Sequence, residues 1–220
     1  MIVALLGDPI SASLSPVMQN AAFAARGLDW TYVALRVRAG DLEDALRGLV
    51  ALGFAGANVT TPHKRAVARL VGSDLESVNT IIVRDGEVRT ASTDAAVLDG
   101  LELDRAAILG GGGAAAAFAA ALPEAVRFSR RETWPPDVTG VDLVVNATSE
   151  RDEVLVELDP GQTLIDLPYP ATATARDAEQ RGAHVLGGLE VLVAQGAASF
   201  ELWTGVAAPV EVMRAAVSSR

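Results

Sequence analysis

The stretch AAILGGGGAAAAFAAAL, residues 106–122, decides the fold class of this chain. It predicts a strand, a glycine loop and an alanine-rich helix, because four consecutive glycines are incompatible with a well-formed membrane helix. The loop satisfies the pattern G-x-G-x-x-A between a hydrophobic strand and a helix, which is the context of a dinucleotide-binding fingerprint. A glycine run taken alone also fits a flexible turn. The predicted cofactor-binding residues of the loop are Gly110, Gly112, Gly113 and Ala114, and Ala115 is small enough for close helix packing.

The residues after the next predicted strand, 126–129, indicate which dinucleotide would bind. Ser129, Arg130 and Arg131 lie where an NAD-binding protein usually has an acidic residue for the ribose. Arginine at this point suits the 2′-phosphate of NADP. The alternative is a solvated surface pair of arginines. The series of strand, glycine loop, helix, strand and basic residues favours NADP(H) as the cofactor.

Outward from this region, apolar strand-like runs alternate with helical patterns, which is typical of α/β architecture with mainly parallel strands. The pattern restarts near residue 95, after a hairpin predicted at Asp85-Gly86, so we expect two lobes. Ser15 and Asp41 are predicted to cap helices with their side chains, and Pro62 to open another. We predict strands at 3–7, 30–37, 55–59, 77–83, 87–93, 105–110, 126–129, 142–148 and 163–167, and late helices from about 172, 189 and 206.

Composition narrows the function classes. The 220 residues include 18 basic and 28 acidic ones, and the net charge of -10 opposes binding to nucleic acid or anionic membranes. Without cysteine and with two histidines, the chain offers neither a thiol nucleophile nor a cysteine or histidine-rich metal site, and we predict no metal. The first residues, MIVALLGDPI, lack the pattern of a signal peptide, so a cytoplasmic location is expected.

Lys64 is the only lysine in a chain whose lysines and arginines total 18. It follows the strand predicted at 55–59, so it is expected at the carboxyl edge of a sheet, where open α/β folds bind ligands. An ammonium group can transfer a proton or stabilise a developing alkoxide, whereas a guanidinium hardly ever releases its proton. The alternative is a single lysine that survived by chance in an arginine-rich composition.

Six motifs, in one order along almost the whole chain, resemble the shikimate dehydrogenase family. They are GDPISASLSPVMQNAAF (7–23), GANVTTPHK (56–64), ESVNT (76–80), STD (92–94), NATS (146–149) and LEVLVAQGAASFELWTG (189–205). The S-x-S-P, N-V-T-x-P-x-K and Q-x-x-x-F-x-x-W-T-G patterns are the most specific. The resemblance implies a substrate-binding α/β domain formed by 1–95 with 189–220, a Rossmann-like NADP-binding domain at 96–188, and an active-site cleft between them.

The resemblance also implies roles for individual residues. Lys64 and Asp94 match the catalytic lysine and aspartate. The substrate-binding positions are Ser13 and Ser15 for the carboxylate, Tyr169 near the carboxylate, and Thr60, Asn79 and Gln195 for the ring hydroxyls. Asn146, Ala147, Thr148 and Gly188 match positions beside the cofactor. The implied reaction is NADPH-dependent reduction of 3-dehydroshikimate to shikimate, a step of the shikimate pathway of aromatic amino-acid biosynthesis.

Several positions depart from the family pattern, so alternatives to the implied function stay open. The segment after Arg131 is compressed, and YPATAT is one residue shorter than its counterpart, which would displace Tyr169. The substituted positions are Ala12, Gln19, Ser92, Ala95 and Glu190. One alternative is a paralogue that acts on quinate, an aminoshikimate or a related cyclic hydroxy acid. Another is a ligand-binding relative without catalysis. The chain is compatible with a homodimer but contains no stripe that identifies an interface.

Overall fold

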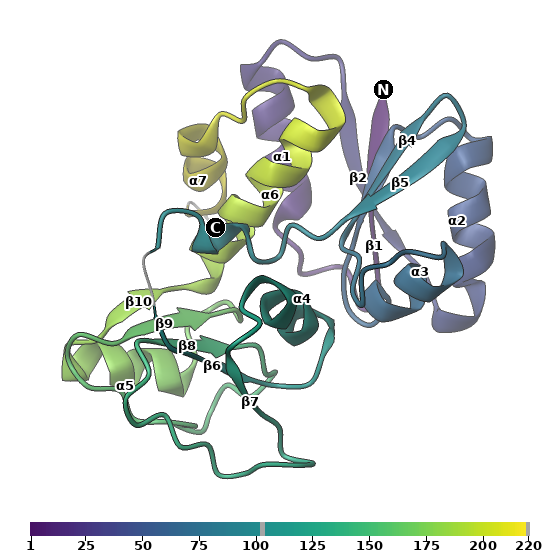
Figure 1. Cartoon of the computed structure of the whole chain (residues 1–220). Coiled ribbons are helices and arrows are strands. Elements are labelled where there is room, and N and C mark those ends of the chain that lie inside the picture. The colour runs from purple at the N-terminus through teal and green to yellow at the C-terminus, as the bar shows by residue number, and fades with distance from the viewer. Residues whose placement is uncertain (102–103, 219–220) are drawn as a thin grey trace. The chain divides into compact units, whose positions relative to one another are not determined.

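A computed structural model gives the fold of the chain and describes residues 1–101 and 104–218 (Figure 1). Residues 102, 103, 219 and 220, which the predicted domains include, lie outside the described residues. The chain forms two compact units, one of Met1–Asp94 with the residues from Leu192 onward, the other of Ala95–Val191. Each unit contains one five-stranded sheet, so the predicted two-sheet α/β class is confirmed.

The sheet of the first unit is mixed. Its strands are β1 (Ile2–Gly7), β2 (Thr31–Arg36), β3 (Gly56–Val59), β4 (Thr80–Arg84) and β5 (Glu87–Ala91), in the order β2-β1-β3-β4-β5. β1 pairs with β2 and β3 in parallel, whereas β3–β4 and β4–β5 are antiparallel. The hairpin predicted at Asp85-Gly86 joins β4 and β5, and both residues have positive φ. The antiparallel pairs place the residues that follow β5 near those that precede β4.

Helices cover both faces of this sheet (Figure 1). α2 (Leu42–Ala51) and α3 (Lys64–Leu70) lie on one face, and α1 (Ser15–Ala25) and α6 (Gly188–Thr204) on the other. α7 (Val210–Ser218) packs against α1, and short 3-10 turns occupy Ala39–Asp41 and Ala96–Leu98. The rings of Phe23 and Phe200 stack at 5.3 Å between their centroids, which joins α1 to α6. None of the helices in the described residues has the length and apolar character of a membrane span.

Neither predicted cap forms a side-chain capping bond, although Asp41 does occupy the N-cap position of α2. Ser15 lies inside the first turn of α1, the N-cap is Leu14, and no side chain caps the helix. The hydroxyl oxygen of Ser13 instead accepts a hydrogen bond of 3.3 Å from the Ser15 amide. Asp41 stands at the N-cap of α2, but its side chain makes no capping bond. The Ser15 hydroxyl is thereby available for contacts within the fold.

The third helix begins later than Pro62. Residues 60–63 form a turn in which the His63 amide donates to the Thr60 carbonyl at 2.9 Å, and α3 starts at Lys64. Buried His63 contacts the Val37 carbonyl through Nε2 at 2.7 Å, which holds this turn beside the end of β2. Lys64 is therefore the first residue of a helix that follows directly from β3.

The sheet of the second unit is parallel throughout. Its strands are β6 (Ala106–Leu109), β7 (Val126–Phe128), β8 (Leu143–Asn146), β9 (Thr163–Asp166) and β10 (His184–Leu186), in the order β10-β9-β8-β6-β7. α4 (Gly113–Ala121) and α5 (Ala173–Arg181) lie on opposite faces (Figure 1). β10 is missing from the sequence-based prediction, because three residues carry too little periodicity to mark a strand. The late helix expected from 206 begins at Val210.

Two connections of this sheet, β7 to β8 and β8 to β9, contain no helix. Both faces of a parallel sheet must nevertheless be covered, since the strands are apolar on either side. Val138 from the first connection and Val156 and Leu158 from the second pack with α5 against β8 and β9. The two irregular segments thus bury the sheet face that helices usually cover.

Candidate active site

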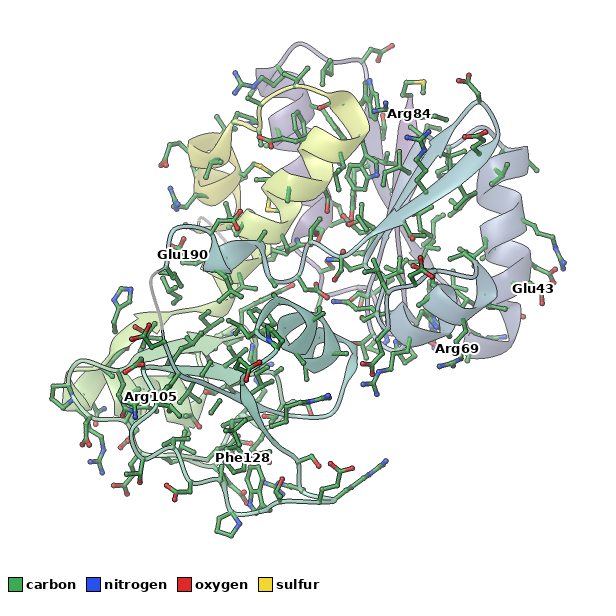
Figure 2. All side chains as sticks on the ribbon, in the orientation of Figure 1. Glu43, Arg69, Arg84, Arg105, Phe128 and Glu190 are labelled. Atoms are coloured by element: carbon green, nitrogen blue, oxygen red, sulfur yellow. The ribbon has the colours of Figure 1, made fainter. Side chains whose placement is uncertain are left out.

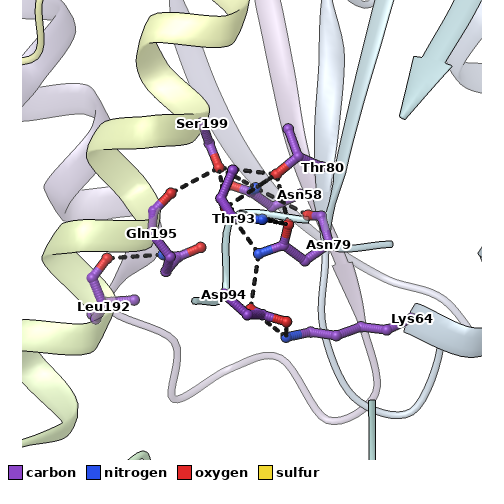
Figure 3. Close-up of polar contacts among 9 residues, drawn as sticks. All are labelled: Asn58, Lys64, Asn79, Thr80, Thr93, Asp94, Leu192, Gln195 and Ser199. Atoms are coloured by element: carbon purple, nitrogen blue, oxygen red, sulfur yellow. Dashed lines mark hydrogen bonds and ion pairs between the residues drawn. The ribbon is translucent and has the colours of Figure 1, made fainter. Parts of the chain in front are cut away.

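Lys64 and Asp94 form a buried ion pair in the first unit. Nζ of Lys64 lies 2.7 Å from Oδ1 and 2.6 Å from Oδ2 of Asp94, and the two side chains are 14% and 9% exposed (Figure 3). Lys64 begins α3 after β3, and Asp94 follows β5, so two strand ends bring them together. A pair with so little water around it keeps a defined geometry, because each charge needs the other.

Asn79 holds Asp94 from the other side. Its Nδ2 donates to Oδ1 of Asp94 at 2.8 Å and to the Thr93 hydroxyl at 3.0 Å. Its Oδ1 accepts from the Thr93 amide at 2.8 Å, and only an oxygen can accept that bond, so the orientation of the amide is determined. Both amide hydrogens are therefore used within the protein. Asn79 positions the carboxylate that contacts Lys64, and its predicted contact with substrate stays a prediction.

A second asparagine, Asn58, lies at the centre of this polar cluster. Its Nδ2 donates to the Asn79 carbonyl, at 3.1 Å, and to the Ser199 hydroxyl of α6, at 2.9 Å (Figure 3). Its Oδ1 accepts from the Tyr32 hydroxyl at 2.9 Å. Asn58, Tyr32 and Ser199 are not among the site residues predicted from the sequence. The available signal was an asparagine inside the fully buried strand Gly56–Val59, since a buried amide must be hydrogen-bonded.

Ser15 connects to the same cluster through Tyr32. Burial raises the pKa of the Tyr32 phenol, and a hydrogen bond with the Ser15 side chain lowers it by less. The phenol therefore stays protonated and can donate to Asn58. A continuous set of hydrogen bonds runs from Tyr32 through Asn58 to Asn79 and Asp94. The structure thus places a predicted carboxylate-binding residue beside the network that holds both predicted catalytic residues.

The other predicted substrate residues lie on neighbouring elements or in the second unit. Thr60 follows β3, and its methyl group packs so closely on Gly7 that a Cβ there would lie 2.4 Å away. Gln195 is half-buried in α6, where its Nε2 donates to the Leu192 carbonyl at 2.8 Å. Tyr169 is half-buried in the second unit, before Pro170. Its predicted place beside the substrate stays a prediction.

Two of the substituted positions contain buried polar atoms. Gln19 is fully buried, and its Nε2 donates to the Gly196 carbonyl at 2.9 Å, which ties α1 to α6. Within the described part of the chain, its Oε1 and the Ser92 hydroxyl have no hydrogen-bond partner. Glu190, labelled in Figure 2, belongs to the first turn of α6. A carboxylate there is favourable, because the amide groups at a helix N-terminus attract negative charge.

The glycine loop of the second unit has the shape that a dinucleotide requires. Gly110 has a φ of +125°, and a Cβ on it would lie 2.9 Å from the Ala147 carbonyl oxygen. At Gly111 and Gly112, in contrast, an added Cβ would meet nothing within 4 Å. α4 begins at Gly113 without a side-chain cap. Open space before an uncapped helix N-terminus fits a pyrophosphate, so the residues present fit NADP(H).

The two arginines after β7 differ in their contacts. Nη2 of Arg130 lies 2.8 Å from Oε2 of Glu153 and 3.6 Å from Oε2 of Glu150. Its guanidinium carbon also stands 5.4 Å from the centre of the Trp134 ring. Arg131 is exposed and forms no ion pair with any residue that the structure describes. Of the two arginines predicted to bind the phosphate, Arg130 contacts carboxylates of the described residues and Arg131 does not. Ser129 is half-buried between β7 and the arginines.

Two predicted cofactor residues have evident structural contacts. Fully buried Asn146 donates through Nδ2 to Asp166 at 2.7 Å, and its Oδ1 accepts from the Thr148 hydroxyl at 2.8 Å. Its side chain and the Thr148 hydroxyl are therefore engaged within the unit, and the cofactor contacts predicted for Asn146, Ala147 and Thr148 stay predictions. At Gly188 a Cβ would lie 2.4 Å from the Pro168 carbonyl oxygen. This close backbone packing explains the glycine without a cofactor contact, and the predicted contact stays a prediction.

Comparisons with known proteins agree with this arrangement. The shikimate dehydrogenase substrate binding domain matches residues 5–81, and the shikimate 5′-dehydrogenase C-terminal domain matches 188–217. The shikimate dehydrogenase (NADP(+)) of Moorella thermoacetica is 40% identical over 267 positions, covering 96% of this chain and 90% of its own length. The alignment is longer than this chain of 220 residues, so the relative has segments without a counterpart here.

Solved structures show the same similarity. A crystal structure of shikimate dehydrogenase in complex with NADP+ is 30% identical, with a TM-score of 0.87 over 99% of this chain and 94% of that one. The Thermus thermophilus enzyme in complex with NADP(H) and shikimate is 28% identical, with a TM-score of 0.88 over 100% of this chain and 99% of that one. The resemblance seen in the six motifs is confirmed. The chain belongs to the shikimate dehydrogenase family.

Proposed function

We propose that this protein catalyses the NADPH-dependent reduction of 3-dehydroshikimate to shikimate. The observation that carries the proposal is the buried Lys64–Asp94 pair, held by Asn79 at the ends of β3 and β5. Relatives that match the chain along nearly its full length are named shikimate dehydrogenase (NADP(+)), and their resemblance supports the same substrate and cofactor here. A polar pair this well supported is hard to explain by folding alone, since apolar residues of similar volume would be at least as stable.

The chemistry requires a proton donor beside the carbonyl oxygen. NADPH supplies the hydride that reduces the carbonyl carbon. The Lys64 ammonium lies beside the oxygen, lowers the energy of the developing alkoxide and gives it a proton. Asp94 contacts Nζ through both oxygens and so limits the rotation of the ammonium group. In the reverse direction, the same amine accepts the proton from the hydroxyl group of shikimate.

The substrate is a small anionic ring, and the first unit offers donors for each of its groups. The hydroxyls of Ser13 and Ser15 bind the carboxylate, and Ser15 also lies in the first turn of α1, where a helix favours negative charge. Thr60 and Gln195 bind ring hydroxyls. Because Ser15 and Asp94 belong to one compact unit, the distance between the carboxylate site and the reacting oxygen is set within that unit.

NADP(H) binds to the second unit in this proposal. Gly111, Gly112 and the first turn of α4 hold the pyrophosphate, with Ala147 and Thr148 beside them. Arg131, Arg130 and Ser129 receive the 2′-phosphate. We infer that residues 1–95 and 189–220 supply the substrate site and residues 96–188 the cofactor site. Tyr169 and Gly188 remain predicted contributors.

The decisive test is nicotinamide absorbance in a mixture of purified protein, 3-dehydroshikimate and NADPH. We expect oxidation of NADPH that is much slower with NADH and is lost in Lys64→Ala. Shikimate with NADP+ should give the reverse reaction. Ranking a panel of ring acids, including quinate and an aminoshikimate, by kcat/KM separates the favoured substrate from its alternatives. Absence of turnover with every cofactor, together with calorimetric binding of shikimate, would instead identify a ligand-binding relative.

A further inference from the structure

The end of β7 carries an arginine whose surroundings are acidic. Arg130 faces two carboxylates of the β8–β9 connection, Glu150 and Glu153, and the ring of Trp134. All four residues belong to the second unit. Neither Glu150 nor Glu153 takes part in the chemistry proposed at Lys64. Both carboxylates contact Arg130, which binds the 2′-phosphate of NADP in the proposed function.

The two carboxylates are held differently. Oε1 of Glu150 accepts hydrogen bonds from the amides of Asp152, at 3.1 Å, and Arg151, at 3.0 Å. These bonds are the main causes that lower the pKa of Glu150, and the charge of Arg130 adds to them. The side chain of Glu153 is 66% exposed, and its carboxylate contacts Arg130 at 2.8 Å. Glu150 is therefore fixed by backbone, whereas Glu153 can leave its partner for solvent.

A phosphate and a carboxylate use the same donors of a guanidinium group, because both present anionic oxygens that accept its hydrogen bonds. The Trp134 ring lies near the guanidinium of Arg130. The Nη2 of Arg130 donates a hydrogen bond to the Glu153 carboxylate. A phosphate that approaches Nη2 must displace Glu153 or approach beside its negative charge. In either case, the carboxylate weakens the interaction.

We propose that Glu153 is a specificity-determining residue that competes with the 2′-phosphate of NADP for Arg130 and thereby lowers the preference for NADP over NAD. The proposal rests on the proposed function, in which Arg130 binds that phosphate. NAD lacks the phosphate, so its affinity does not depend on the competition. Exposed ion pairs are weak, and removal of the carboxylate is expected to strengthen binding of the phosphorylated ligand about two- to fivefold.

Calorimetry with two nucleotide fragments isolates this effect from catalysis. Adenosine 2′,5′-bisphosphate carries the 2′-phosphate, and 5′-AMP lacks it. We would measure the Kd of both for the full-length protein and for Glu153→Gln. The control is Glu157→Gln, which removes an equally exposed carboxylate of the same connection, paired with Arg181 at 2.6 Å. Both variants change the net charge by the same amount.

The expected result is a roughly two- to fivefold lower Kd for the bisphosphate in Glu153→Gln only, with 5′-AMP unchanged. The gain should shrink at high salt, because screening weakens exposed pairs. In Arg130→Gln, the further change Glu153→Gln should have no effect, since the shared partner is gone. Full NADP+ should follow the bisphosphate, and NAD+ should follow 5′-AMP.

Other outcomes separate the inference from the function. Equal changes in Glu153→Gln and Glu157→Gln would show a general charge effect and overturn the inference. Weaker binding of both fragments in Glu153→Gln would assign the carboxylate to loop structure and also overturn it. Binding of the bisphosphate that survives Arg130→Gln unchanged would leave NADP as the cofactor but remove the competition. A wild-type protein that binds neither the bisphosphate nor NADP+ would overturn both proposals.

Discussion

The chain contains two pairs of opposite charges at predicted ligand sites, and they are built in opposite ways. The Lys64–Asp94 pair is buried, and an amide of Asn79 holds the carboxylate in place. The Arg130–Glu153 pair is exposed, with side chains 56% and 66% accessible. A buried pair cannot exchange its partners without leaving a charge unsatisfied, whereas an exposed pair can. The first arrangement suits a fixed proton donor, and the second suits a cation that must accept a phosphate.

The largest expected effect comes from removing the buried cation. Lys64→Met should lower kcat about 10²- to 10⁴-fold, because the developing alkoxide loses its proton donor. It should also destabilise the fold by about 3–5 kcal/mol, since Asp94 is left buried without a partner. Activity assays and urea unfolding measure the two effects.

Two further variants serve as controls for this prediction. Lys64→Met combined with Asp94→Asn should recover most of the stability but no activity, because the uncompensated charge is gone. Arg69→Met removes an exposed cation from the same helix and should leave both quantities nearly unchanged. Turnover by Lys64→Met at the wild-type rate would contradict the role of the buried Lys64–Asp94 pair as a fixed proton donor.

The next largest effect is the loss of stability expected when the buried side-chain amide of Asn58 is removed. Asn58→Leu should lower the free energy of unfolding by about 2–4 kcal/mol, because Tyr32, Ser199 and the Asn79 carbonyl lose a shared partner. Urea unfolding followed by circular dichroism measures it. The matched control is Gln162→Leu, a half-buried amide of the second unit bonded to the Val141 carbonyl at 2.7 Å. Similar losses in both variants would contradict the special position of Asn58.

A smaller loss of stability is expected at Gly188. Gly188→Ala should cost about 1–3 kcal/mol, since a Cβ there would press on the Pro168 carbonyl. Gly187→Ala is the control, because an added Cβ at the neighbouring glycine meets nothing within 4 Å. Thermal unfolding of both variants without ligand gives the comparison. If Gly188→Ala unfolds like the wild type and only loses NADP+ affinity, the glycine serves the cofactor and not the packing.

The smallest effect in this series tests the exposed cations. Arg131→Gln should weaken NADP+ binding about tenfold and leave NAD+ binding unchanged, because one charge-assisted contact to the 2′-phosphate is lost. Arg127→Gln, an exposed arginine of β7, provides the same change of charge as a control. Calorimetric Kd values for both nucleotides measure the outcome. An equal loss in the two variants would point to long-range charge instead of a contact.

Local sequence was enough to predict the positions that depend on neighbouring residues. The glycine loop between β6 and α4 follows from a turn that only glycine adopts at Gly110, together with the helix that begins at Gly113. The place of Lys64 at a strand end follows from the apolar strand before it and the helix after it. Ser15 is not the N-cap of α1, and Asp41 is the N-cap of α2 but makes no capping bond, because a cap depends on the path of the chain before the helix as well as on the residue type.

The partners of these residues were not readable from local patterns. Asn58 bonds to Ser199, 141 residues away, and Arg130 pairs with Glu153, which lies beyond β8 in a connection without regular structure. Gly188 is required by the carbonyl of Pro168, which packs against it from another part of the chain. Such contacts depend on how strands are ordered in a sheet, and periodicity carries no information about that order.

Sequence alone thus determined the α/β class, the dinucleotide loop, the family and the identity of the two predicted catalytic residues. Their motifs are short, Lys64 is also the single lysine of the chain, and the role of Asp94 is what the family resemblance implies. Tertiary structure alone decided that Asp94 is held by Asn79, that Asn58 joins Tyr32 and Ser199 to the same network, and that Arg130 faces carboxylates. The physical reason is that hydrogen bonds and ion pairs act over a few ångströms in space, whatever the separation along the chain.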